Sequence, residues 1–193
     1  MILSIVGYGH PTLRKKASPV NPDYPGLQKL IANMFETMYK AHGVGLAAPQ
    51  VNESVRVFII DSTPMVDEPE EGQEPETPVK KVFINARILS ETGTEWGFNE
   101  GCLSIPEVRE EVKRKDTIVI HYFDENFQEK TETYNGIVAR IIQHEYDHIE
   151  GILFIDRISA FRRQLLKNRL LRIQKGDIRT GYPMKFANVT KVK

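Results

Sequence analysis

Apolar residues recur at helical spacing in three stretches of the chain. The first stretch opens after Pro25 and closes near Gly43, the second lies between Asn135 and Gly151, and the third covers about 159–175. Repeats of three and four residues are typical of helices that bury one face. The pattern therefore predicts an N-terminal helix, a central helix apolar enough to be largely buried, and a C-terminal helix.

Shorter apolar runs between these stretches predict strands. They fall at 56–61, 80–85, 88–91, 117–123 and 127–133. Asp124, Glu125 and Asn126 separate the last two runs and are typical of a hairpin turn. We therefore expect an α+β fold. In it, antiparallel strands in small sheets surround the central helix, and the other two helices pack outside.

The length of 193 residues is typical of one domain with a sizeable core, so we expect a single catalytic domain over 1–193. Between two expected strands, residues 62–80 are rich in acidic residues and proline. Such a segment buries too little apolar surface to fold alone. We expect a mobile acidic insertion there.

Charge is balanced, with 26 basic and 26 acidic residues, which argues against a nucleic-acid-binding or membrane-surface protein. No apolar run is as long as a membrane span, and the first residues do not resemble a signal peptide. Cys102 is the single cysteine. These features predict a cytoplasmic protein that has no membrane partner. The C-terminal helix has a basic polar side, which is either a solvated face or a docking face for an acidic partner.

The central helix contains an H-E-x-x-H pattern within Gln143–His148. His144 and His148 are four residues apart, and Glu145 follows the first histidine. Residues four apart lie on one face of a helix, so both imidazoles can reach one metal ion. Glu145 is rotated by about 100° and would flank the ion without binding it. The pattern points to a metallohydrolase, and the alternative is an ordinary amphipathic helix that carries two histidines.

A catalytic metal usually has three protein ligands and one open position. In metzincin-type proteases the third ligand is a histidine six residues after the second, but Phe154 occupies that position here. The residues alone leave several candidates open. They are Glu150, Asp156, His10, His42, His121, Cys102 and several carboxylates upstream of the motif. Cys102 stands out because the glycine before it allows close backbone approach, although a lone cysteine is often just a small buried residue.

Three blocks of the sequence resemble bacterial peptide deformylases. The blocks are Gly43–Gln50, Glu100–Ser104 and Gln143–His148, in the order and spacing of that family. Leu13, Arg14 and the C-terminal helix extend the resemblance over nearly the whole chain, and the long C-terminal helix is similar to the type 1 branch. Two features depart from the family pattern. The acidic insertion is longer than in many members, and Arg140 replaces an apolar residue that some members use near the methionine pocket.

The resemblance implies roles for individual residues. The metal ligands would be Cys102, His144 and His148. Glu145 would be the general acid and base, while Gln50 and the backbone N–H of Leu103 would stabilise the oxyanion. Further residues would contact the substrate. They are Val44, Gly45, Arg109 and Ile137.

The resemblance also implies an activity. The enzyme would remove the formyl group from the N-terminal formyl-methionine of new polypeptides and release formate. Its cofactor would be one divalent metal ion, Fe(II) in the first place, with Zn, Ni or Co as alternatives. Its partners would be formyl-methionyl nascent chains, and the ribosome through the basic C-terminal helix. Two other functions stay open: a zincin-like metallo-endopeptidase, and a non-enzymatic ribosome-associated protein with a structural metal site.

Overall fold

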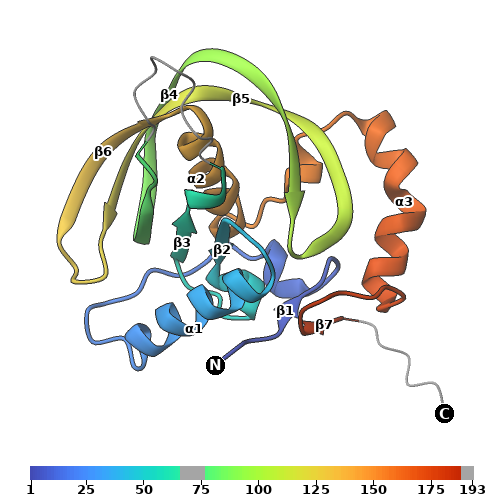
Figure 1. The fold of residues 1–193 in the computed structure, drawn as a ribbon, viewed down its shortest axis with the longest axis horizontal. Helices are drawn as coiled ribbons and strands as arrows, with labels where there is room; N and C mark the ends of the chain where they lie inside the picture. The colour runs from blue at the N-terminus through green and yellow to red at the C-terminus, as the bar shows by residue number, and fades with distance from the viewer. Residues whose placement is uncertain (66–76, 188–193) are drawn as a thin grey trace.

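The computed structural model describes residues 1–65 and 77–187 (Figure 1). The α-helices of this part of the chain are α1 (Leu27–Lys40), α2 (Gly136–Ile149) and α3 (Ala160–Lys175). The strands are β1 (Ile5–Val6), β2 (Gly45–Ala47), β3 (Val57–Asp61), β4 (Lys80–Cys102), β5 (Ile105–Phe123), β6 (Glu129–Asn135) and β7 (Met184–Lys185). Short 3-10 helices are η1 (Pro11–Arg14), η2 (Ala48–Val51), η3 (Thr63–Met65) and η4 (Phe154–Asp156).

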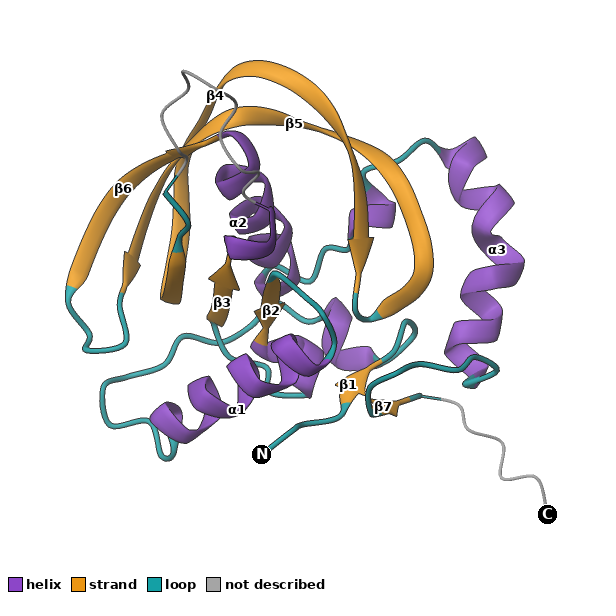
Figure 2. Ribbon diagram, viewed as in Figure 1, coloured by secondary structure: helices purple, strands orange, loops and turns teal. Residues whose placement is uncertain are grey.

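An antiparallel sheet in the order β2-β3-β4-β5-β6 wraps around α2, which confirms the expected α+β fold (Figure 2). Strands β4 and β5 form a long hairpin that arches over the helix. The sequence predicted two separate strands at 80–85 and 88–91, whereas β4 runs on without a break to Cys102. Register shifts within β4 interrupt the apolar alternation and so hide this continuity.

The first half of β5 was missed by the sequence pattern. Its burial alternates along the strand, with Val108, Glu110, Val112 and Arg114 pointing inward. Two of these four side chains are charged, so the period of two was not visible as an apolar pattern. The buried charges are paired within the protein, and one of them reaches the candidate site.

Helix α2 is the buried centre of the molecule, as expected. Asn135 occupies its N-cap position, and Gly151 follows its C-terminus with a φ of 77°. A side chain at Gly151 would also lie within 3.0 Å of backbone atoms of Arg14. The helix contacts β2, β3, β5 and β6, so strands from distant parts of the sequence hold it in place.

The two outer helices, α1 and α3, differ in how much of their apolar surface is buried. Helix α1 packs one face into the core through residues such as Met34 and Met38. Ser159 caps α3 by accepting a hydrogen bond from the backbone N–H of Arg162. The expected apolar face of α3 is only partly correct. Its buried residues are Leu170 and Ile173, whereas Phe161 is 71% and Leu165 59% exposed.

After α3 the chain returns across the molecule, where β7 pairs with β1 in parallel (Figure 1). Of the expected acidic insertion at 62–80, residues 66–76 lie outside the described residues. The flanking parts form η3 and the start of β4. Within the described residues, no helix combines the length and the apolar character needed to cross a membrane.

Candidate metal centre

Three side chains offer ligand atoms that all lie within 4.8 Å of one another. They belong to Cys102, His144 and His148. The two histidines are one turn apart on α2, with ring centroids separated by 5.2 Å. The end of β4 brings the thiol alongside them, with Sγ of Cys102 3.3 Å from Nε2 of His148. Two distant segments thus converge on one point.

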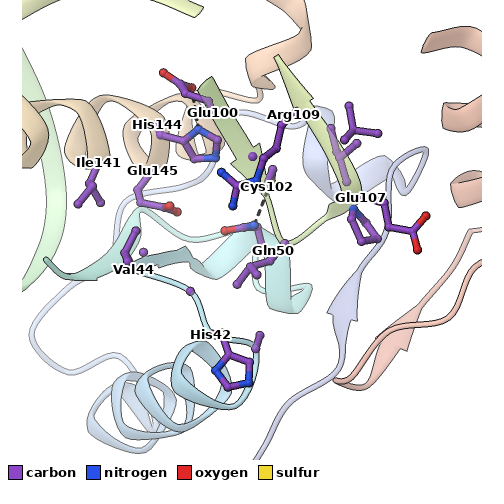
Figure 3. Close-up of a pocket in the computed structure, with 18 of the residues that line it drawn as sticks. His42, Val44, Gln50, Glu100, Cys102, Glu107, Arg109, Ile141, His144 and Glu145 are labelled. Atoms are coloured by element: carbon purple, nitrogen blue, oxygen red, sulfur yellow. Dashed lines mark hydrogen bonds and ion pairs between the residues drawn. The ribbon is translucent and has the colours of Figure 1, made fainter. Parts of the chain in front are cut away.

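The orientation of His144 is set by Glu100. Its Nδ1 lies 3.0 Å from a carboxylate oxygen of Glu100 (Figure 3). An ionised carboxylate can only accept a hydrogen bond, so Nδ1 carries a proton, and in the neutral imidazole Nε2 is then the nitrogen with a lone pair for a metal. This carboxylate–histidine arrangement is typical of metal-binding histidines. One thiol and two imidazoles also form a donor set that suits Fe, Zn, Co or Ni, so the residues fit a divalent transition metal.

Glu100 is itself held by buried arginines. Arg114 donates to both of its carboxylate oxygens, at 2.7 and 2.9 Å, and Nη1 of Arg140 donates at 2.9 Å. Burial alone would raise the pKa of Glu100, but hydrogen bonds from Arg114 and His144 lower it well below its usual range. Arg114 also donates to Asp147 at 2.7 Å. The carboxylate beside His144 therefore stays ionised.

Glu145 points into the same region from α2 (Figure 3). Its side chain is 5% exposed, and burial raises its pKa to about 7. Gly45 on β2 makes room for it, because a Cβ there would lie 2.5 Å from Oε1 of Glu145. Within the part of the chain that the structure describes, Oε2 of this carboxylate has no hydrogen-bond partner. It is free to accept a proton from a ligand.

Gln50 and Leu103 lie on the other side of the cysteine. The backbone N–H of Ala47 donates to Oε1 of Gln50 at 2.9 Å, so the amide nitrogen faces the site. That nitrogen is 3.5 Å from Sγ of Cys102 and 3.2 Å from Oγ of Ser104. The carbonyl oxygen of Leu103 accepts a hydrogen bond of 2.8 Å from the hydroxyl of Tyr182.

A cavity of about 810 Å³ opens in front of these groups. Its size is within the usual range for ligand pockets. The expected substrate-contacting residues all line it: Val44, Gly45, Arg109 and Ile137. Arg109 folds back over Gly101, where a Cβ would be 3.3 Å from the Cγ of the arginine. In Figure 3 the carboxylate of Glu107 points away from the histidines.

Four of the other candidate third ligands are engaged elsewhere. His121 pairs with Glu129 at 2.7 Å, and Glu150 pairs with Arg56 at 2.7 Å. Asp156 accepts the backbone N–H of Leu153 at 2.8 Å, and His10 caps η1. His42 lines the cavity but is not in the group of ligand atoms around the α2 histidines. In the described chain, Cys102 is the candidate that completes that group.

Comparison with known proteins agrees with this geometry. Residues 2–164 match the family model described as polypeptide deformylase. The curated peptide deformylase of Christiangramia forsetii is 55% identical over 100% of both chains. The chain belongs to the peptide deformylase family. It is a hydrolase that removes the N-formyl group from newly made polypeptides.

Solved peptide deformylases share the fold. The enzyme from Legionella pneumophila has a TM-score of 0.78 and 36% identity, covering 93% of this chain and 99% of its own. A class I type b peptide deformylase from Acinetobacter baumannii, solved with Met-Ala-Ser bound, has a TM-score of 0.73 and 32% identity. That match covers 82% of this chain and 99% of its own. The family is metal-dependent, in agreement with the Cys-His-His group. These matches favour the deformylase over the endopeptidase and the structural metal protein.

Several residues of this deformylase site were missed from the sequence. Glu100 lies within the recognised block Glu100–Ser104, but its contact with His144 depends on the fold. Arg140 was expected near the methionine pocket. It lines the cavity, yet it is buried and hydrogen-bonded to Glu100 and to the backbone oxygens of Val112 and Trp96. Tyr182 carried no signal at all, since it lies outside every motif.

Proposed function

We propose that Cys102, His144 and His148 hold one divalent metal ion, Fe(II) by preference, and that Glu145 moves the protons of the deformylation. The grouping of the three ligand atoms within 4.8 Å carries the proposal. A bound divalent ion would supply Lewis-acid chemistry, since it would lower the pKa of water toward about 7 and stabilise negative charge on oxygen. Zn, Ni or Co would satisfy the same donors.

Glu145 is the acid and base in this proposal. Its carboxylate accepts a proton from the water that attacks the formyl carbon. It then delivers that proton to the amine as the C–N bond breaks, so the products are formate and a free methionyl terminus. A pKa of about 7 supports both steps, because a group that titrates near the working pH can take up and release a proton.

Gln50 and Leu103 stabilise the oxyanion in this proposal. The side-chain amide of Gln50 faces Cys102, and the N–H of Leu103 belongs to the next residue along the chain. Both donors would point at the carbonyl oxygen as negative charge develops on it. Loss of one such donor typically lowers kcat by about 10²–10³.

The substrate is proposed to lie along the cavity. Val44, Gly45, Arg109 and Ile137 line it, which supports their role as peptide contacts. The Acinetobacter enzyme was solved with Met-Ala-Ser, so a formylated form of that tripeptide is a suitable substrate for this chain. Since new polypeptides are made in the cytoplasm, we place the reaction there.

The test is release of formate from formyl-Met-Ala-Ser by protein purified without oxygen and analysed for metal. Glu145→Gln should retain metal but lose nearly all turnover. Equal turnover by a metal-loaded Glu145→Gln variant would contradict the acid–base role. Stoichiometric zinc, with little iron, in the most active preparation would contradict the preference for Fe(II).

The ribosome is a proposed partner through α3. Its exposed face combines basic residues with the exposed side chains of Phe161 and Leu165, which would suit an acidic surface with apolar patches. Binding to purified ribosomes should weaken with salt. It should also weaken in Arg163→Glu. Salt-independent binding, unchanged by the substitution, would contradict this docking face.

A further inference from the structure

Two arginines from the C-terminal part of the chain line the same cavity as the metal centre. They are Arg169 on α3 and Arg179 in the segment after it. Thr180 and Tyr182 line the cavity beside them. All four follow residue 164, where the match to the family model ends. One wall of the cavity is therefore built by a part of the chain that lies beyond the match to the family model.

Several contacts fix this wall in place. Leu170, next to Arg169, is buried in the core, and so is Ile173 one turn later. Helix α3 ends at its C-cap residue, Gly176. The segment after it is fixed by Tyr182, whose hydroxyl donates a hydrogen bond of 2.8 Å to the carbonyl oxygen of Leu103. The C-terminal end of the same segment is held by the pairing of β7 with β1. The backbone that carries the two guanidinium groups is thus well anchored.

The two guanidinium groups have no carboxylate partner among the described residues, unlike other arginines nearby. Arg162 pairs with Glu110 at 2.8 Å, and Arg172 pairs with Asp177 at 3.0 Å. No ion pair or side-chain hydrogen bond of Arg169 or Arg179 occurs within residues 1–65 and 77–187. Both are exposed, so they keep their charge available to a ligand.

The acidic residues of the cavity do not neutralise these charges. Glu100 is paired with buried arginines, and Glu145 is buried at the metal centre. Glu107 is the remaining acidic residue that lines the cavity, against Arg109, Arg169 and Arg179. The outer part of the cavity therefore carries a positive potential, which attracts carboxylates. Guanidinium groups also match the two oxygens of a carboxylate in geometry.

We propose that Arg169 and Arg179 form a subsite for the carboxylate side chains of peptide residues downstream of the formyl-methionine. The enzyme then deformylates chains with an early Asp or Glu faster than their neutral counterparts. An extended peptide advances about 3.3–3.6 Å per residue, so residues beyond the second can reach the outer cavity. This subsite rests on the proposed function, since it assumes that the formyl end lies at the metal centre.

The experiment compares amidated peptides that differ in one group. Formyl-Met-Ala-Asp-amide is paired with formyl-Met-Ala-Asn-amide, and the same Asp/Asn pair is then moved to positions four and five. We expect kcat/KM for the best Asp peptide to exceed its Asn partner by about threefold to tenfold at low salt, mainly through KM. The preference should shrink as salt is added. Formyl-Met-Ala-Ser as free acid and as amide reports separately on a terminal carboxylate.

The variant that tests the subsite is Arg169→Gln with Arg179→Gln. Its Asp/Asn ratio should fall to about one while turnover of the Asn peptide is kept. The matched control is Arg87→Gln with Lys113→Gln, which also removes two exposed positive charges but lies outside the cavity. That control should keep the full ratio. A ratio of one in the wild type, or an equal loss in both double variants, would overturn the subsite.

These outcomes are separate from a failure of the proposed function. If the Asn peptides release formate at a normal rate without an Asp preference, only the subsite is wrong. If neither peptide of any pair releases formate from fully metallated wild-type protein, the proposed function is wrong. A preference for the free acid of formyl-Met-Ala-Ser, lost in Arg169→Gln/Arg179→Gln but absent for Asp side chains, would overturn the side-chain subsite and assign the arginines to a chain terminus.

Discussion

Nδ1 of His144 lies 3.0 Å from a carboxylate oxygen of Glu100, and this contact joins the metal centre to a buried network of charges. The same carboxylate accepts hydrogen bonds from Arg114 and Arg140. Glu100 therefore orients a proposed ligand and also accepts hydrogen bonds from two buried guanidinium groups, of which Arg114 pairs with Asp147 as well. A substitution there should affect both metal binding and stability.

We predict that Glu100→Gln weakens metal binding by about 10- to 100-fold, because His144 loses its charged orienting partner. The substitution also takes from buried Arg140 its carboxylate partner among the described residues, while Arg114 keeps Asp147, and loss of one partner of a buried ion pair costs about 3 kcal/mol or more. For a domain of this size, Tm should fall by roughly 6–12 °C. Metal titration and thermal unfolding measure the two effects. The control is Glu110→Gln, which leaves behind the exposed guanidinium of Arg162 and should change metal affinity little. Equal metal affinity in the two variants would contradict the orienting role.

Gly45→Ala should lower kcat by about 100-fold, since a Cβ at this position would lie 2.5 Å from Oε1 of Glu145. The carboxylate must then move, and displacement of a catalytic group by about 1 Å has an effect of this size. Metal content should stay the same. Gly181→Ala is the matched control, because a Cβ there has no atom within 4 Å among the described residues. Full activity of metal-loaded Gly45→Ala protein would show that Glu145 tolerates a different position.

Removal of the metal should lower stability, because the ion binds the folded state alone. At a free metal concentration 100 times Kd the stabilisation is about 2.7 kcal/mol, so a chelator should lower Tm by roughly 5–10 °C. Cys102→Ala protein should show a much smaller shift. If chelation lowers Tm equally in both proteins, Cys102 is not a ligand.

Glu132 should make the fold sensitive to acid. Burial opposes its ionisation, but hydrogen bonds from Lys81, Tyr122 and Tyr134 outweigh that and lower its pKa to about 2. A carboxyl group whose pKa is lower in the folded than in the unfolded chain stabilises the fold above its ordinary pKa of 4.5. That contribution is lost as pH falls from 4.5 toward 2.

We therefore predict that Glu132→Gln lowers Tm at pH 7 and that its Tm approaches the wild-type value near pH 2–3. Thermal unfolding followed by circular dichroism between pH 7 and 2.5 measures this convergence. Glu125→Gln, which removes an exposed carboxylate from the turn before β6, should follow the wild type at every pH. A constant difference between Glu132→Gln and wild type would contradict the linkage.

The sequence predicted α2 and its two histidines because these signals were local. His144 and Glu145 share one helix, and the resemblance implied a role for Cys102 that spacing could not derive. The partner of His144 could not be predicted from local signals, because Glu100 contacts this histidine only in the folded chain, where β4 arches over α2. Phe161 and Leu165 follow helical spacing but stay exposed, since periodicity cannot say which apolar face finds a partner. Both features depend on contacts between residues that are far apart in the sequence, and a local pattern does not contain such contacts.

Tyr182 gives the last prediction, because it joins the C-terminal segment to the proposed oxyanion donor. Its hydroxyl donates to the carbonyl of Leu103 at 2.8 Å, which restrains the backbone on which the N–H of Leu103 is carried. Tyr182→Phe keeps the ring but removes this hydrogen bond. We expect kcat to fall several-fold with KM nearly unchanged, since the oxyanion donor acts on the transition state.

The loss in stability should be modest, at about 0.5–1.5 kcal/mol for one hydrogen bond. Steady-state kinetics with formyl-Met-Ala-Ser and thermal unfolding separate the two effects. Tyr24→Phe, at a partly buried tyrosine that packs against the α1 core, is the control for removal of a hydroxyl group. If Tyr182→Phe lowers kcat only in proportion to the folded fraction, the tyrosine is merely structural. A kcat defect in fully folded protein assigns it a positioning role, because a structural contact alone would leave turnover per folded molecule unchanged.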